Sequence, residues 1–184
     1  MTKPKAVEQV APRIFTIGHS THDFDDVVQM LRANDVTELV DVRSIPGSRK
    51  YPQWNQDAIK TELPADIQYR WLKDLGGRRY TPVGVATPNE GWRVKAFSDY
   101  ADYMATDDFQ SGLDELLHIA AKSVPAIMCS EAVPWRCHRR LITDALLVKG
   151  AEVLHIMSAT STKPAEMTPF AVVEHGKITY PAAE

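Results

Sequence analysis

Apolar residues recur along the chain with two different periods, which predict two kinds of secondary structure. The stretch from Phe24 to Leu31 places its apolar residues at i, i+3, i+4 and i+7, the spacing of a helix with one apolar face. Short apolar runs bounded by glycine, proline or polar residues are instead typical of buried strands. Five such runs occur, at residues 13–17, 38–42, 67–72, 124–128 and 152–157.

Helical patterns separate these predicted strands. Besides the helix that begins near Phe24, we expect helices over residues 55–63, 94–104, 107–121 and 137–149. Thr106 is a favourable N-cap residue, and Gly150 is a favourable residue to end the last helix. The segment Ser20-Thr21-His22-Asp23 has the spacing of a capping box, with Asp in place of the usual Glu.

The alternation of strands and helices favours a three-layer α/β fold. We expect a mainly parallel central sheet of about five strands with helices on both faces, as in Rossmann-like and flavodoxin-like proteins. Residues 170–173 and 177–180 flank Glu174-His175-Gly176, which predicts a terminal hairpin. Residues 1–12 mix Lys, Pro, Glu and Gln, so we expect a flexible tail followed by one domain over residues 13–184.

Composition narrows the class of protein. The 184 residues are 44% hydrophobic and 24% charged, as in ordinary soluble globular proteins. The net charge of −3 argues against broad electrostatic binding to nucleic acid, although a local basic patch would still allow it. The sequence has two cysteines and no signal-peptide pattern, so we expect a cytoplasmic protein with reduced thiols. No apolar run approaches the roughly 20 residues of a membrane span, so we expect no membrane partner. The oligomeric state is left open.

Reactive groups concentrate where the strand over residues 124–128 gives way to the next helix. Both cysteines, Cys129 and Cys137, lie in this stretch together with Glu131, His138 and Arg139. Because the carboxyl ends of parallel strands meet at one edge of a sheet, polar residues that follow other strands should converge there. The polar residues at the carboxyl ends of the first two strands are His19, Ser20, Asp41 and Arg43.

The chemistry of each side chain suggests a role for it in a site. The candidate catalytic residues are Cys129, Glu131, His19 and Asp41. The candidate substrate-binding residues are Arg43, Ser20, Cys137, His138, Arg139 and Trp54. Arginine side chains and helix N-terminal amides bind anions, and carboxylates or histidines transfer protons once their pKa values are shifted. Either cysteine would be a nucleophile only if its pKa is depressed; otherwise it is a buried structural thiol.

Known cysteine and metal patterns match this region only in part. Strand–loop–helix phosphatases and rhodanese-like enzymes place a cysteine at a strand end, before a loop that cradles an oxyanion. Here six residues separate Cys129 from Arg136, one more than in the phosphatase cradle, and Pro134 removes an amide donor. A metal site built from both cysteines, His19 and His138 is chemically feasible, but the spacing fits no zinc pattern. We therefore predict no metal and no cofactor.

The stretch 73–93 is the least regular part of the chain. It is rich in glycine, proline and arginine, and a loop of this length inside a domain is usually functional, so a lid over the pocket is one interpretation. Aromatic residues concentrate between residues 51 and 103, among several arginines, an arrangement able to stack on a base and contact phosphates. Tyr51, Trp54 and Trp92, beside proline, glycine and arginine, are the candidates for a pocket rim.

Taken together, the motifs resemble the DUF488 family, a set of bacterial and archaeal proteins named for its unknown function. The matching segments are Thr16-Ile17-Gly18-His19-Ser20, Asp41-Val42-Arg43, Leu75-Gly76-Gly77, Cys129-Ser130-Glu131 and Cys137-His138-Arg139. They extend from about residue 14 to residue 157, most of the chain. The resemblance implies an α/β fold with a polar pocket and supplies no reaction.

Two main hypotheses for function follow. The first is an enzyme acting on an anionic small molecule, phosphorylated or nucleotide-like, at the carboxyl edge of the sheet. The alternative is a non-catalytic module that binds a nucleotide or nucleic acid, with an affinity that falls steeply with salt and with no turnover. A third, a structural or partner-binding protein, is supported only by the lack of a decisive motif.

Overall fold

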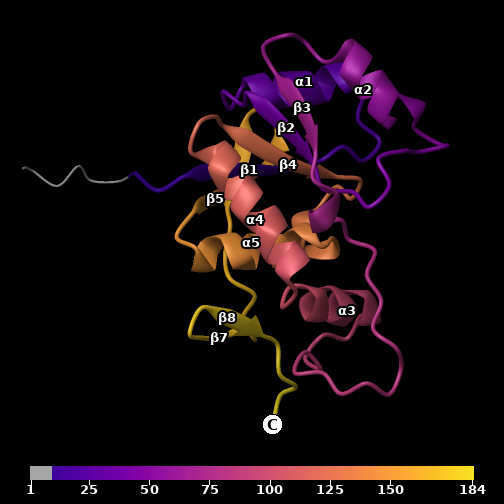
Figure 1. Cartoon of the computed structure of the whole chain (residues 1–184). Coiled ribbons are helices and arrows are strands. Elements are labelled where there is room, and N and C mark those ends of the chain that lie inside the picture. The colour runs from indigo at the N-terminus through magenta and orange to yellow at the C-terminus, as the bar shows by residue number, and fades with distance from the viewer. Residues whose placement is uncertain (1–9) are drawn as a thin grey trace, which may run out of the picture.

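A six-stranded sheet forms the centre of the protein in the computed structural model, which describes residues 10–184 (Figure 1). Most of the tail predicted over residues 1–12 lies outside the described residues. The strands, in the spatial order β3-β2-β4-β1-β5-β6, are β1 (Arg13–Gly18), β2 (Glu38–Asp41), β3 (Gln68–Trp71), β4 (Pro125–Cys129), β5 (Glu152–Ser158) and β6 (Ser161–Pro164). The first five run parallel, and β6 pairs antiparallel with β5.

Helices cover both faces of the sheet. One face carries α1 (Phe24–Arg32) and α2 (Gln56–Glu62), and the other carries α4 (Asp107–Ala120) and α5 (Arg139–Val148), with α3 (Lys95–Tyr103) beside α5 (Figure 1). Short 3-10 helices lie at Pro52–Trp54, Lys73–Leu75 and Pro134–Arg136. The predicted three-layer α/β fold is therefore confirmed. None of the helices within residues 10–184 is long and apolar enough to cross a membrane.

The central strands divide their side chains between two cores. In β4, Ala126 and Met128 join the core under α1 and α2, whereas Ile127 and Cys129 join the core under α4 and α5. All five residues of β4 are buried, because a central parallel strand is covered on both faces. This burial explains the continuous apolar run in the sequence. The strand period also places the Cys129 side chain on the α5 side of the sheet.

Local turn and cap chemistry confirms two further predictions. The terminal hairpin consists of β7 (Val172–Glu174) and β8 (Lys177–Thr179), antiparallel to each other. Its two turn residues, His175 and Gly176, have φ angles of 51° and 75°, as a two-residue hairpin of matching twist requires. At the start of α4, the Thr106 hydroxyl accepts a hydrogen bond from the Phe109 amide at 3.3 Å.

Two local predictions are wrong. The capping box does not form, because α1 begins at Phe24 with Asp23 as its N-cap residue. Ser20 instead belongs to the end of β1, where its φ of 44° directs its amide to the Ser130 carbonyl at 3.0 Å. The sequence pattern also missed β6, whose four residues are all exposed, so that no apolar period marks this edge strand.

The chain topology opens a crevice between β1 and β4. These strands are neighbours, yet the chain leaves β1 for α1 on one face and leaves β4 for α5 on the other (Figure 1). Such a switch point, at the carboxyl ends of the strands, is where open α/β sheets bind ligands. The His19 amide donates to the Cys129 carbonyl at 3.0 Å and so extends the strand pairing to the rim of the crevice.

Candidate functional site

A pocket of about 650 Å³ occupies this crevice. Its wall comes from the segments that follow β1, β2 and β4, together with Gly77, Arg78 and the start of α3. The candidate residues that line it are His19, Ser20, Arg43, Cys129, Glu131, Cys137 and His138. Three other candidates, Asp41, Trp54 and Arg139, are at most 1% exposed and lie behind the lining.

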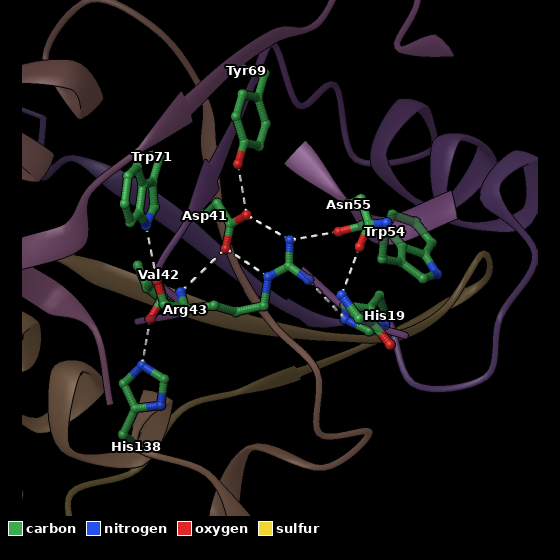
Figure 2. A network of polar contacts seen from close by, with 10 residues as sticks. His19, Asp41, Val42, Arg43, Trp54, Asn55, Tyr69, Trp71 and His138 are labelled. Carbon is green, nitrogen blue, oxygen red and sulfur yellow. Dashed lines mark hydrogen bonds and ion pairs between the residues drawn. The ribbon is translucent and has the colours of Figure 1, made fainter. Parts of the chain in front are cut away.

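Asp41 and Arg43 form a buried ion pair beneath one side of the pocket (Figure 2). Arg43 donates from Nε to Asp41 Oδ1 at 2.9 Å and from Nη2 to Asp41 Oδ2 at 2.8 Å. The Arg43 amide and the Tyr69 hydroxyl complete the set of donors to this carboxylate, at 3.1 and 2.7 Å. Within the described residues, the hydrogen bonds that the Asp41 carboxylate accepts come from Arg43 and Tyr69. The carboxylate therefore holds Arg43 in place and neutralises its charge.

The same arginine positions His19 (Figure 2). The Arg43 Nη1 faces the His19 Nε2 at 3.5 Å, while the His19 Nδ1 donates to the Ser20 carbonyl at 3.0 Å. The His19 ring stacks on Trp54, with centroids 4.9 Å apart and an interplanar angle of 14°. Burial lowers the pKa of His19 to about 4, and the Arg43 charge acts in the same direction. His19 is therefore neutral at pH 7, and Trp54 supports it from behind.

Arg139 occupies a different environment, between the two cysteines. It donates from Nε to Cys129 Sγ at 3.0 Å, and its amide donates to Cys137 Sγ at 3.4 Å. Its other guanidinium contacts are the Thr16 hydroxyl at 3.2 Å and the Glu131 carbonyl at 2.6 Å. Arg139 is 1% exposed, and none of the ion pairs found within residues 10–184 involves it. Its partners are therefore sulfur atoms and neutral oxygens.

His138 lies between Cys137 and the end of β2. Its Nε2 donates to the Val42 carbonyl at 2.7 Å (Figure 2), and its Nδ1 lies 3.5 Å from Cys137 Sγ. Because a carbonyl oxygen only accepts, Nε2 carries a hydrogen and Nδ1 is free to take the proton of the Cys137 thiol. A thiol, an imidazole nitrogen able to accept its proton and a carbonyl that orients the imidazole are thus in contact.

The two thiols have opposite acidities. Burial alone would raise the pKa of Cys137, but the hydrogen bond from Cys129, the His138 ring and the Arg139 charge together hold it well below its usual range. Burial raises the pKa of Cys129 well above its usual range, and the adjacent Cys137 sulfur adds to the effect. The surroundings therefore favour the thiolate form at Cys137 and the protonated form at Cys129.

The remaining pocket wall is mainly cationic. Lys50, Arg78 and Arg136 are exposed side chains in the lining, and Glu131 is the carboxylate among the lining residues. Since Asp41 already neutralises Arg43, the three exposed cations face one carboxylate. Aliphatic and aromatic contacts come from Ile45, Tyr51 and Phe97.

The irregular stretch over residues 73–93 is hydrogen-bonded to α3, and of its residues Gly77 and Arg78 line the pocket. Thr81, Thr87 and Asn89 all donate hydrogen bonds to the carboxylate of Asp102 in α3. The Arg79 guanidinium lies 3.7 Å from the centre of the Tyr103 ring, also in α3. A lid function for residues 73–93 stays a prediction.

The metal interpretation has little geometric support. In the described part of the chain, no three His, Cys, Asp or Glu side chains gather closely enough to hold an ion. Of the four side chains considered for such a site, His19 faces Arg43 and His138 contacts Cys137. Both cysteine sulfurs accept hydrogen bonds from Arg139.

Several residues of the site escaped the sequence analysis. Thr16 accepts from Arg139 and bonds His155 Nδ1 at 2.7 Å, and burial, with Arg139 and Lys163, lowers the pKa of His155 to about 4. A Cβ atom at Gly77 would lie 2.5 Å from His138 Nδ1, and one at Gly18 would lie 1.7 Å from the Glu131 carbonyl oxygen. Thr16, Gly18 and Gly77 lie in segments that resemble the family, but the sequence assigned them no contact, and nothing in the sequence singled out His155.

The fold and the site together define an α/β protein with two cysteines in a pocket at the switch point of its sheet. Residues 23–146 match the model of DUF488, a domain of unknown function, and the chain therefore belongs to the DUF488 family. The resemblance predicted from the motifs is confirmed. Comparison of the chain with curated proteins and with solved structures gave no match.

Proposed function

We propose that the protein is an enzyme that binds a small anionic molecule, phosphorylated or nucleotide-like, in this pocket and attacks it with the Cys137 thiolate. The observation that carries the proposal is the environment of Arg139. A buried guanidinium is costly unless a negative charge lies beside it. The groups in contact with Arg139 are two sulfurs, a hydroxyl and a carbonyl, and of these only a thiol ionises near neutral pH.

Cys137 is a better nucleophile than Cys129 for three reasons. It contacts the His138 Nδ1, which accepts the thiol proton. It lies at the N-terminus of α5, where the Arg139 amide and the helix dipole stabilise an anion. Cys129 is as deeply buried, and within residues 10–184 no histidine contacts its sulfur, so burial raises its pKa and favours the protonated thiol.

The other candidate residues take supporting roles in this proposal. The exposed Glu131 carboxyl, on the pocket wall, is placed to contact a bound substrate and to orient its groups. His19 and Arg43 would orient the substrate, with Asp41 and Trp54 fixing them from behind. A cytoplasmic location, which we also propose, would keep both thiols reduced.

The charge and size of the pocket support an anionic ligand. Lys50, Arg78 and Arg136 outnumber the one carboxylate of the lining. The volume of about 650 Å³ falls within the roughly 300–1,000 Å³ that is usual for small-molecule sites. Arginine forks match phosphate and carboxylate oxygens, which favours a phosphorylated molecule or a nucleotide.

The test compares two alkylating reagents of nearly equal size, iodoacetate and iodoacetamide, which differ in charge. The cationic wall should shift the preference of Cys137 toward iodoacetate by about 10-fold relative to free cysteine, equivalent to about 1.4 kcal/mol. Arg78→Gln and Arg136→Gln should each reduce this shift. Arg49→Gln, an exposed position outside the lining, is the matched control and should retain it. A preference equal to that of free cysteine contradicts the proposal.

Protection by ligands then identifies the substrate class. Inorganic phosphate, nucleotides, sulfur oxyanions and short oligonucleotides are each tested for slowing the alkylation and for raising the melting temperature, since a ligand of the folded state stabilises it. The exposed cations also fit the alternative of a nucleotide-binding or nucleic-acid-binding module without catalysis. That alternative predicts binding that falls steeply with salt and is unchanged in Cys137→Ser.

A further inference from the structure

The geometry points to a second activity at the same edge of the sheet: Cys129 and Cys137 form a two-cysteine site that reduces hydroperoxides. Cys137 is the thiolate that reacts with the peroxide, and Cys129 is the thiol that resolves the product to a disulfide. This activity uses the thiolate of the proposed enzyme but needs neither an anionic ligand nor the cationic wall, so it extends beyond the proposed function.

The two sulfurs are placed for such a reaction. The chain has two cysteines, eight positions apart, and both side chains line the same pocket. Arg139 contacts both sulfurs, at 3.0 Å through Nε and at 3.4 Å through its amide. Each cysteine is among the groups that shift the pKa of the other, and both cysteines are free. Two cysteines held against the same arginine form a disulfide once their sulfurs approach to bonding distance.

The surroundings distinguish the roles of the two sulfurs. Cys137 touches His138 and a helix N-terminal amide, which favour the thiolate, the form that reacts with peroxides. Cys129 ends β4, 2% exposed, and lies inside the core on the α5 side. A protonated thiol held behind a thiolate is the arrangement that lets a second cysteine capture the first oxidation product.

The reaction balances in two steps. In the first, the Cys137 sulfur attacks one peroxide oxygen, the O–O bond breaks, and the departing alkoxide or hydroxide takes the proton held by His138. Cys137 is then a sulfenic acid, oxidised by two electrons, and the peroxide is reduced. In the second, the Cys129 sulfur attacks the Cys137 sulfur, the S–O bond breaks, and hydroxide leaves as water with the Cys129 proton. A low-molecular-weight dithiol restores both thiols by exchange.

The experiment treats the fully reduced chain with less than one equivalent of hydrogen peroxide at pH 6. Wild type should react about 10-fold or more faster than free cysteine, with two thiols lost for each peroxide and a mass lower by two hydrogens, because the thiolate is already present. Cys129→Ser should react at a similar rate and stop at the sulfenic acid, which dimedone traps. Cys137→Ser should react no faster than free cysteine. Arg140→Gln, one residue from Arg139 and outside the pocket lining, should behave as wild type.

Three results would overturn the inference. They are a wild-type rate equal to that of free cysteine, an undiminished rate in Cys137→Ser, and a wild-type product that is a sulfinic acid or a dimer joined between chains. Alanine variants at both positions, with thermal melts, separate a lost thiol from a lost fold. Hydrogen peroxide carries no charge, so its rate tests the thiols alone, whereas the iodoacetate preference tests the cationic wall. Failure of one proposal is thereby distinguishable from failure of the other.

Discussion

Two buried arginines lie at the same edge of the sheet, and they differ in what balances their charge. Arg43 is 7% exposed and forms a two-point ion pair with the Asp41 carboxylate. Arg139 is 1% exposed and contacts sulfur atoms, a hydroxyl and a carbonyl. A carboxylate is ionised at any pH near neutrality, whereas a thiol is ionised only where its surroundings require it. The first arginine therefore fixes structure, and in the function that we propose the second stabilises the Cys137 thiolate.

The comparison extends to a histidine beside each arginine. His19 faces Arg43 directly, and His155 contacts Arg139 through the Thr16 hydroxyl. Burial lowers both pKa values to about 4, with the neighbouring arginine acting in the same direction. Both histidines are neutral at pH 7, so neither adds a second positive charge beside the buried arginines.

The largest effect should come from removing Arg43. In Arg43→Met, the Asp41 carboxylate is left buried without its partner, and breaking a buried ion pair in this way costs about 3–5 kcal/mol. We therefore expect urea denaturation to show a loss of about 3–4 kcal/mol in the free energy of unfolding. The double variant Asp41→Asn/Arg43→Met should recover more than half of this loss. A loss below about 1 kcal/mol would mean that the pair is not a structural anchor.

Removing Arg139 should affect reactivity more than stability. In Arg139→Met the Cys137 thiol simply keeps its proton at pH 7, so we expect a stability loss of only about 1–2 kcal/mol from lost hydrogen bonds. The pKa of Cys137 should rise, and its alkylation rate at pH 6 should fall about 10-fold. Arg140→Met, at the neighbouring position, should stay within about twofold of wild type. Equal rates in the two variants would remove Arg139 from the account.

The smallest effect is the pH dependence of stability. A histidine whose folded pKa is about 4 and whose unfolded pKa is 6.5 stabilises the fold above pH 6.5. This contribution is lost as the pH falls toward 4, by up to about 1.4 kcal/mol per pH unit for each histidine. Urea denaturation at pH 6.5 and pH 5 should therefore show a shallower pH dependence in His19→Gln and in His155→Gln, by similar amounts. No change in either variant would contradict burial of neutral histidines.

The sequence was sufficient for the fold because the elements carry strong local signals. The apolar run that became β4 and the helical spacing that became α1 each predicted the element within a residue or two. The convergence of His19, Arg43 and Cys129 also followed, since parallel strands bring their carboxyl ends together. The fully exposed β6 carried no apolar period and could not be found this way.

The side-chain contacts within the site could not be predicted, because they join residues that are far apart in the sequence. Nothing local distinguishes Arg139, whose side chain turns inward to Cys129, from Arg136, whose side chain stays exposed on the pocket wall. The packing of Trp54 behind His19 likewise depends on a loop closing onto the end of β1. The choice between the two cysteines rests on His138, which the Val42 carbonyl orients from another strand.

The central claim is that Arg139 is balanced by a thiolate on Cys137, and the pH dependence of thiolate ultraviolet absorbance tests it most directly. The wild-type protein is titrated against the double variant Cys129→Ser/Cys137→Ser, which supplies the blank, and against Cys129→Ser, which isolates Cys137 and keeps a hydroxyl donor at position 129. The account predicts one thiolate that persists well below the usual cysteine pKa of about 8.5, present in wild type and in Cys129→Ser. Absorbance that rises only above that pKa in both proteins would mean that no thiolate balances Arg139, and the account would be wrong.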